Sequence, residues 1–270
     1  MSKGKAIVKY GGRTGIVHSR TAPDYSFIYE ASLVKNPEYE IGDRVVLPDG
    51  RVYRYAKSNG VLYAGQGAQG NVEMADGIDY TLLGAAQAIG DTEVTFAAAT
   101  HPAFTEDQLR GGHILISDSE LVGLSDARIQ NRGIIGNDAS LENAACTVYL
   151  DGPLVRAVST STYAFCMPSE YSDIWKANKP GASVLGVPAV YVDAAAKYFW
   201  LQTWGIAWIA MSGNLGKTDL YRGFAFRGTD GLIVEFDNSV ANASTQYGGF
   251  VVDNNWTANG ATFMMLQLAP

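Results

Sequence analysis

The chain has 270 residues, of which 47% are hydrophobic, 11% are aromatic and 17% are charged. Because disordered chains are rich in charge and poor in aromatic residues, this composition excludes extensive disorder and predicts one long folded domain or two small ones. The net charge of −7 argues against a body that grips nucleic acid, since proteins that do so carry basic surfaces.

An extended basic arm is predicted over residues 1–38. The segment lacks a strong hydrophobic periodicity, and its first twenty residues carry no acidic side chain but five basic ones, Lys3, Lys5, Lys9, Arg13 and Arg20. A basic arm on an acidic body can dock on an acidic partner, and the alternative is a solvated, frayed terminus. The same twenty residues lack the apolar stretch of a signal peptide, so we expect synthesis in the cytoplasm.

A small β domain is predicted over residues 39–100. Two β-rich runs, 44–47 and 51–55, flank Pro48-Asp49-Gly50, where proline presets φ and glycine tolerates a positive φ. We therefore expect a hairpin here. The other segments are predicted as strands at 61–64 and 93–98, a polar loop at 65–80, and a short helix or a strand at 81–88.

The main β domain is predicted over residues 101–270. Thr105, followed by acidic residues, predicts one short helix or turn. The two cysteines, Cys146 and Cys166, lie in apolar, strand-like surroundings and are predicted to be buried free thiols. Short apolar runs predict strands at 113–117, 128–135, 146–150, 154–159, 162–166, 184–192, 221–226, 232–236, 250–252 and 262–268. Many short strands separated by turns indicate a mainly β fold with sandwich or barrel-like domains and few short helices.

The most apolar stretch is residues 198–211, which hold three of the five tryptophans. It is too short and too interrupted to span a membrane, which takes about 20 apolar residues. Its aromatic and β-branched content predicts two strands, 198–204 and 206–211, bent at Gly205.

Both faces of this stretch carry large side chains. Because side chains alternate along a strand, Trp200, Gln202 and Trp204 are expected on one face. We expect the rest of the domain to cover one face, and the other face is a candidate surface for a neighbouring subunit. Trp200, Trp204 and Trp208 are therefore the candidate oligomer interface.

Residues for catalysis or metal binding are few. His18, His101 and His113 have no cysteine, histidine or carboxylate partner at ligand spacing. No nucleophile-elbow, zinc-protease or phosphate-loop motif occurs, and the acidic run at 117–120 lacks the spacing of a calcium loop. We therefore predict no catalytic residue, no metal and no cofactor. The tyrosines and tryptophans could stack on sugars or anchor a protein interface, and we favour the interface.

Three segments resemble structural proteins of bacteriophage heads. GDRVVLPDGRVYRYAKSNGVLYAG is similar to their N-terminal strand–turn–strand, which often reads GD followed by DGR, an aromatic residue and RY. GVPAVYVDAAAKYFWLQTWGIA is similar to a later element with two aromatic residues, tryptophan and a Q-T pair before a glycine. RGTDGLIVEF through QYGGFVVDNN to MMLQLAP is similar to their closing strands. The likeness covers residues 39–64 and 184–270, and residues 101–183 carry no matching motif.

This resemblance implies a capsid decoration, or cement, protein on the surface of the virion head. Such proteins are β-rich homo-oligomers, often trimers, without catalytic residues. The implied partners are the major capsid protein and further copies of the chain, with no direct contact to nucleic acid or to a membrane. The basic arm would bridge neighbouring capsid subunits.

Two other functions stay open. A tail or fibre-type module that binds a cell-surface glycan would use the aromatic residues and the polar loops at 65–80, 168–183 and 237–246. The major capsid protein itself is less well supported, because its usual shell fold requires a long spine helix and no periodic stretch here is long enough.

Overall fold

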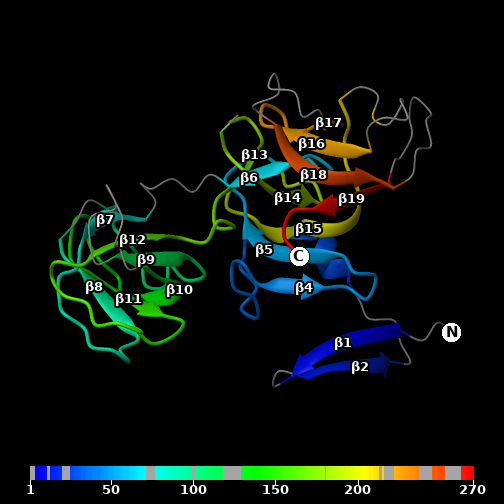
Figure 1. Cartoon of the computed structure of the whole chain (residues 1–270). Coiled ribbons are helices and arrows are strands. Elements are labelled where there is room, and N and C mark those ends of the chain that lie inside the picture. The colour runs from blue at the N-terminus through cyan, green and yellow to red at the C-terminus, as the bar shows by residue number, and fades with distance from the viewer. Residues whose placement is uncertain are drawn as a thin grey trace. The chain divides into compact units, whose positions relative to one another are not determined.

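The computed structural model describes residues 4–10, 13–19, 25–70, 77–98, 101–117, 129–179, 181–212, 215, 222–236, 245–252 and 263–270. Its regular structure is almost entirely β, with a two-stranded hairpin, a six-stranded sheet and an eleven-stranded sheet (Figure 1). The two larger sheets are antiparallel and curl into half-barrels. The prediction of a mainly β, barrel-like fold is confirmed.

The chain forms two compact units, and the second is inserted into the first. Unit 1 comprises residues 1–71 and 173–270, and unit 2 comprises residues 72–172. This division differs from the consecutive domains 39–100 and 101–270 expected from the turn signals. The physical reason is that unit 1 joins strands from both ends of the sequence in one sheet, and turn signals report only pairing between neighbours in the chain.

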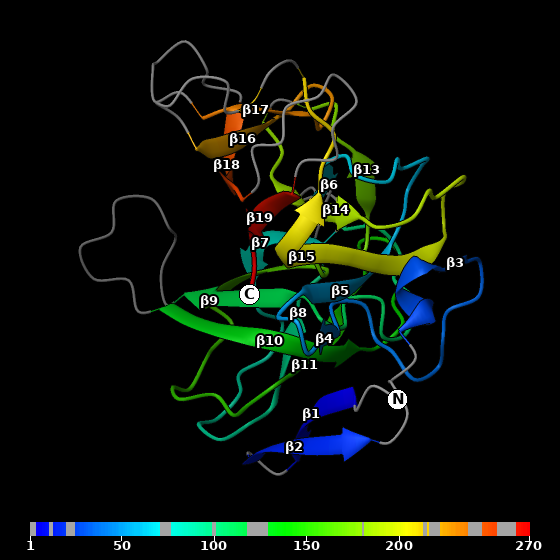
Figure 2. The same cartoon turned by 90° about the vertical axis from the view of Figure 1, so that its right-hand side faces the viewer.

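Unit 1 is organised around one long strand, β15 (Tyr198–Trp208), which lies beside β14 and β19 (Figure 2). Two strands bent at Gly205 were predicted, and the structure instead has a single strand that continues through Gly205 at a φ of 93°. The predicted hairpin around Asp49 is present as β4 and β5. The other strands of the sheet are β3 (Ala31–Ser32), β4 (Arg44–Val46), β5 (Val52–Lys57), β6 (Ala68–Gly70), β13 (Ile174–Lys176), β14 (Val184–Pro188), β16 (Gly223–Arg227), β17 (Ile233–Glu235), β18 (Thr245–Val251) and β19 (Phe263–Gln267).

The N-terminal region is not one continuous arm. β1 (Gly4–Tyr10) and β2 (Arg13–Ser19) form an antiparallel hairpin. Residues 25–38, predicted as part of the arm, belong instead to the body of unit 1, because the 3₁₀ helix η1 (Ser26–Tyr29) buries Ile28 completely and β3 pairs with β15. Burial of an apolar side chain stabilises this attachment by about 2 kcal/mol.

Unit 2 is a six-stranded sheet wrapped around its own apolar core. Its strands, in sheet order, are β7 (Ile78–Leu82), β12 (Tyr163–Met167), β9 (His113–Ser117), β10 (Ile129–Asn137), β11 (Cys146–Leu150) and β8 (Glu93–Phe96). Alternate side chains such as Ile114, Ile116 and Ala164 are buried on one face. The short helix or turn predicted at Thr105 is a series of turns, and the segment predicted at 81–88 contributes the end of β7 and two isolated β-bridges, at Leu83 and Gln87.

The cysteines are both free and buried, as predicted. Burial raises the pKa of the Cys166 thiol from 9.0 to about 12 and also raises the pKa of Cys146. Because only the thiolate is an effective nucleophile, we expect neither thiol to react with Ellman's reagent at mildly alkaline pH until the protein is unfolded in urea.

The same shift has a defined effect on stability. The folded-state pKa of Cys166 lies above its unfolded value. The contribution of this thiol to the free energy of unfolding is therefore complete below pH 9.0, and it is lost as the pH rises towards about 12. Prompt modification of both thiols in the native protein would contradict this description of the core of unit 2.

Candidate binding site

The predicted docking arm is only partly described. Lys5 and Lys9 lie in β1 and Arg13 lies in β2, whereas Lys3 and Arg20 lie outside the described residues. In the register of the hairpin, Lys9 is opposite Thr14 and Lys5 is opposite His18. The role of these basic residues in binding a capsid stays a prediction.

The three candidate interface tryptophans have three different environments. Trp200 is only 3% exposed and packs against the rings of Phe27, Tyr39 and Tyr55, with centroid distances of 5.7, 5.0 and 5.2 Å. It therefore belongs to the core of unit 1 and offers no surface to a partner. Trp204 is half-buried, and Trp208 is 49% exposed. Of the three, Trp208 presents the largest accessible surface.

The exposed ring of Trp208 is held in place by a glycine. Gly65 has a φ of 76°, and a Cβ built on it would lie 2.2 Å from Cζ3 of Trp208. The indole therefore packs directly on the backbone of residue 65. A large aromatic side chain that is exposed yet ordered in advance loses little entropy when a partner covers it.

Arg51 lies at the end of the Pro48–Gly50 turn, and the turn itself orients it. Gly50 adopts a φ of 88°, and its amide donates to the Leu47 carbonyl at 3.0 Å. Asp49 accepts the Arg51 amide through Oδ1 at 3.1 Å and the Arg51 Nε–H through Oδ2 at 2.7 Å. One carboxylate thus holds both the backbone and the side chain of Arg51.

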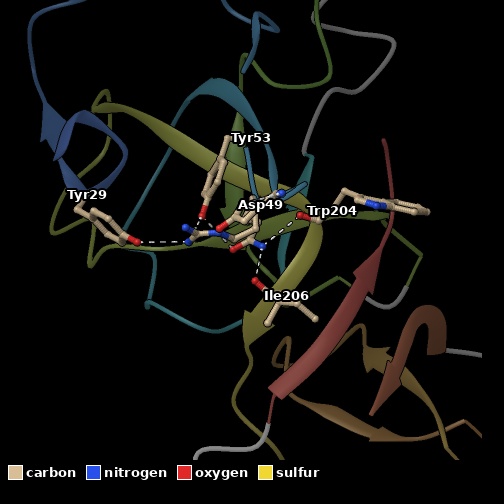
Figure 3. Close-up of polar contacts among 7 residues, drawn as sticks. Tyr29, Asp49, Tyr53, Trp204 and Ile206 are labelled. Atoms are coloured by element: carbon tan, nitrogen blue, oxygen red, sulfur yellow. Dashed lines mark hydrogen bonds and ion pairs between the residues drawn. The ribbon is translucent and has the colours of Figure 1, made fainter. Parts of the chain in front are cut away.

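A chain of hydrogen bonds connects this guanidinium to the centre of β15 (Figure 3). Arg51 Nη1 donates to the hydroxyls of Tyr29 at 3.4 Å and Tyr53 at 3.1 Å, and Tyr53 donates to Gln202 Oε1 at 3.3 Å. The Gln202 amide then donates to the carbonyls of Trp204 at 3.2 Å and Ile206 at 2.9 Å. The Gln202 side-chain amide therefore supplies a donor to the backbone carbonyls on either side of Gly205. The pairing of β15 with β5 shifts register just before this point, between Gln202 and Trp204.

Gly205 permits this arrangement by its lack of a side chain. A Cβ at this position would lie 2.8 Å from the Cα of Arg51 and 3.1 Å from its Cγ. Contacts this short between carbon atoms are repulsive, so only glycine allows the backbone of residue 51 to approach β15 here. Its positive φ gives a second, independent reason for glycine.

The electrostatics keep the network in one protonation state. Burial lowers the pKa of Arg51, but its hydrogen bond to Tyr29 and the proximity of Tyr53 and Asp49 outweigh this effect, so its pKa is raised overall. Burial raises the pKa of Tyr53 to about 12, although Arg51 opposes the shift. At neutral pH the guanidinium is charged and the Tyr53 hydroxyl keeps the proton that it donates to Gln202.

Beside the network lies a pocket of about 400 Å³. Tyr53 and Gln202 form part of its lining, and Trp208 and Phe263 belong to the aromatic part of its wall. Ile206, Trp208 and Phe263 are 40%, 49% and 51% exposed, and Trp208 and Phe263 are direct neighbours on β15 and β19. We call these three residues the apolar ridge.

The sequence pointed to Trp208 at this site but not to Arg51, Gln202 or Phe263. Trp208 was a candidate, but Arg51 and Gln202 are separated by about 150 positions and come together only because β5 pairs with β15. The DGR turn and the Q-T pair were the available signals for Arg51 and Gln202. No sequence pattern indicated that Phe263 would lie beside Trp208.

The arrangement is suited to binding. Arg51 is about one-quarter exposed, and among the described residues no acceptor contacts its Nη2, which can therefore donate to a partner. The structure, in its described ranges, contains no cluster of three or more metal-ligating side chains and no helix that could cross a membrane. No protein-family model, curated protein or solved structure matches the chain.

Proposed function

We propose that the protein is a non-enzymatic structural component of a bacteriophage virion, which decorates and stabilises the head. In this proposal the pocket beside Arg51 and the apolar ridge form the surface that contacts the major capsid protein or a neighbouring copy of a homotrimer. Arg, Tyr and Trp are the residues that most often dominate the binding energy of protein interfaces, and Tyr29, Arg51 and Trp208 occur here around one pocket.

The observation that supports this proposal best is the exposed ring of Trp208 fixed over Gly65. A partner that covers this half-exposed indole gains apolar burial and excludes water from the adjacent Arg51. The charge of Arg51 is already balanced by Asp49, so the partner would supply a carbonyl or hydroxyl acceptor rather than a strong acid. Such contacts, repeated over many copies in a capsid, add up by avidity.

The test is binding of the purified chain to heads assembled from the cognate major capsid protein. Trp208→Ala removes the ridge anchor and Arg51→Gln removes the guanidinium, and each is expected to weaken head binding at least tenfold. Tyr191→Ser is the matched control, because Tyr191 is an exposed aromatic residue, 53% accessible, that does not line the pocket.

One result would argue against the proposal. Unchanged head binding by both Trp208→Ala and Arg51→Gln would remove this surface from the capsid contact. Light scattering distinguishes the two possible partners of the ridge. A trimer that dissociates in Trp208→Ala assigns the ridge to self-association, whereas an intact trimer with weak head binding assigns it to the major capsid protein.

A second candidate function is recognition of a cell-surface glycan by a tail or fibre-type module. It is favoured by a separate pocket in unit 2, whose chemistry differs from that of the Arg51 site.

A further inference from the structure

Unit 2 has a pocket of about 820 Å³ on the face of its sheet that points away from the core. The pocket lies over β12, β9 and β10, which are adjacent strands, and beside the loop that follows β11. Core side chains such as Ile116 and Cys166 occupy the alternate positions of these strands. The volume is typical of small-molecule sites, which span about 300–1,000 Å³.

The lining changes from apolar to polar across the three strands. The register places Phe165 of β12 beside Leu115 of β9, and Leu115 beside Asn131 of β10. Met167 extends the apolar part of the lining along β12. Since neighbouring strands lie about 5 Å apart, the apolar and polar walls are separated by about 10 Å.

The polar wall contains a carboxylate that is held close to the sheet. The amide of Asp151 donates to the Gly133 carbonyl at 3.0 Å, and Asp151 Oδ2 lies 2.8 Å from the position that a Cβ of Gly133 would occupy. Glycine at position 133 therefore lets the carboxylate lie on the backbone of β10. Within the described part of the chain, no donor is bonded to this carboxylate and the side-chain amide of Asn131 has no partner.

The guanidinium of Arg132, which also lines the pocket, is bonded within the fold. Arg132 donates through Nε and Nη2 to the Pro153 carbonyl at 3.2 and 2.8 Å, and through Nη1 to the Asn131 carbonyl at 2.8 Å. These bonds hold the loop after β11 against β10. An anionic ligand would therefore meet the Asp151 carboxylate without a guanidinium directed at it, and the other basic side chain of the lining, His113, lies 3.8 Å from the Glu170 carboxylate.

A purely apolar ligand is also a poor fit. It would cover the Asp151 carboxylate and the Asn131 amide without giving either a hydrogen bond, and burying unpaired polar groups costs free energy. The pocket calls for a ligand with one apolar face and one edge of hydroxyl groups.

We propose that this pocket binds a neutral saccharide. The C–H face of a sugar ring would pack on Phe165, Leu115 and Met167, its hydroxyls would donate to the Asp151 carboxylate, and a ring or hydroxyl oxygen would accept from the Asn131 amide. Hydrogen bonds to an ionised acceptor are stronger than those between neutral groups, so Asp151 would contribute most of the selectivity. The site lies in unit 2 and is independent of the proposed head contact of unit 1.

The experiment is saturation-transfer NMR on the full-length protein with a panel of probes at millimolar concentration. The neutral probes are maltotriose, cellotriose and triacetylchitotriose, and the comparison probes are sialyllactose and a short alkyl alcohol. We expect transfer to at least one neutral trisaccharide and weaker or no transfer to the anionic sugar and the alcohol.

Three variants assign the signal to the pocket. Asp151→Asn removes the charge, Phe165→Ala removes the apolar wall, and Gly133→Ala pushes the Asp151 side chain away by occupying its space; each is expected to weaken binding at least tenfold. Gly133→Ala displaces only the end of a flexible side chain, so it tests the site without threatening the fold. Glu142→Gln, at an exposed position of unit 2, makes the same charge change as Asp151→Asn and should leave binding unaltered.

Three results would overturn the proposal. They are absence of transfer to every neutral probe, preference for the anionic sugar or the alcohol, and binding that survives both Asp151→Asn and Gly133→Ala. Loss of saccharide binding with normal head binding would leave the proposed function of unit 1 intact, so the two proposals can fail separately.

Discussion

Replacement of Gly205 by alanine is expected to lower the free energy of unfolding of unit 1 by about 2 to 4 kcal/mol. A non-glycine residue held at a φ of 93° carries strain of about 1 to 3 kcal/mol, and the added Cβ would also meet the Arg51 Cα at 2.8 Å. The nearest obstacle is backbone, so it cannot move aside as the end of a side chain would. All five tryptophans belong to unit 1, so urea unfolding followed by tryptophan fluorescence reports on this unit.

The matched control for this experiment is Gly60→Ala. A Cβ on Gly60 would have no atom within 4 Å, and we expect a change of no more than about 0.5 kcal/mol. Equal stability of Gly205→Ala and Gly60→Ala would contradict the close approach of residue 51 to β15. If Gly205→Ala also weakens head binding at a temperature where the variant stays folded, the close packing of residue 51 against Gly205 is needed to position the Arg51 side chain for binding.

The second large effect is a contrast between two tryptophans of the same strand. Trp200→Ala is expected to cost about 3 to 5 kcal/mol of stability, because the ring is buried among Phe27, Tyr39 and Tyr55 and its removal leaves a cavity. Trp208→Ala is expected to cost less than about 1 kcal/mol, because the residue is already 49% exposed to solvent.

Circular dichroism in a urea titration is the appropriate measurement, since both variants remove a fluorophore. A cost for Trp208→Ala as large as that for Trp200→Ala would show that the ridge is part of the core and is unavailable to a partner. The expected pattern, a stable Trp208→Ala variant that binds heads weakly, would separate the interface from the fold.

Local patterns were sufficient for the hairpin of β4 and β5 and for the two buried thiols, but they did not predict the hairpin of β1 and β2. The turn at Pro48-Asp49-Gly50 was readable because proline and glycine limit φ directly, and the hairpin followed from it. The buried thiols were readable because Cys146 and Cys166 lie in short apolar strands. From the sequence, Gly205 predicted a bend that divides the strand. In the structure the strand continues, because Gln202 donates hydrogen bonds to the carbonyls on both sides of Gly205, and the sequence does not reveal these bonds.

The sequence by itself determined that the protein is β-rich and that residues 198–208 are a strand-forming stretch dominated by aromatic side chains. The tertiary structure decided which of those side chains are core and which are surface, because burial depends on the strands that pack alongside, and β5 and β19 lie far from β15 in the chain. The same non-local pairing closes unit 1 across the inserted unit 2 and brings Tyr53, which Arg51 contacts, to Gln202. Alternation along one strand specifies two faces, and only the neighbouring strands determine what covers each of them.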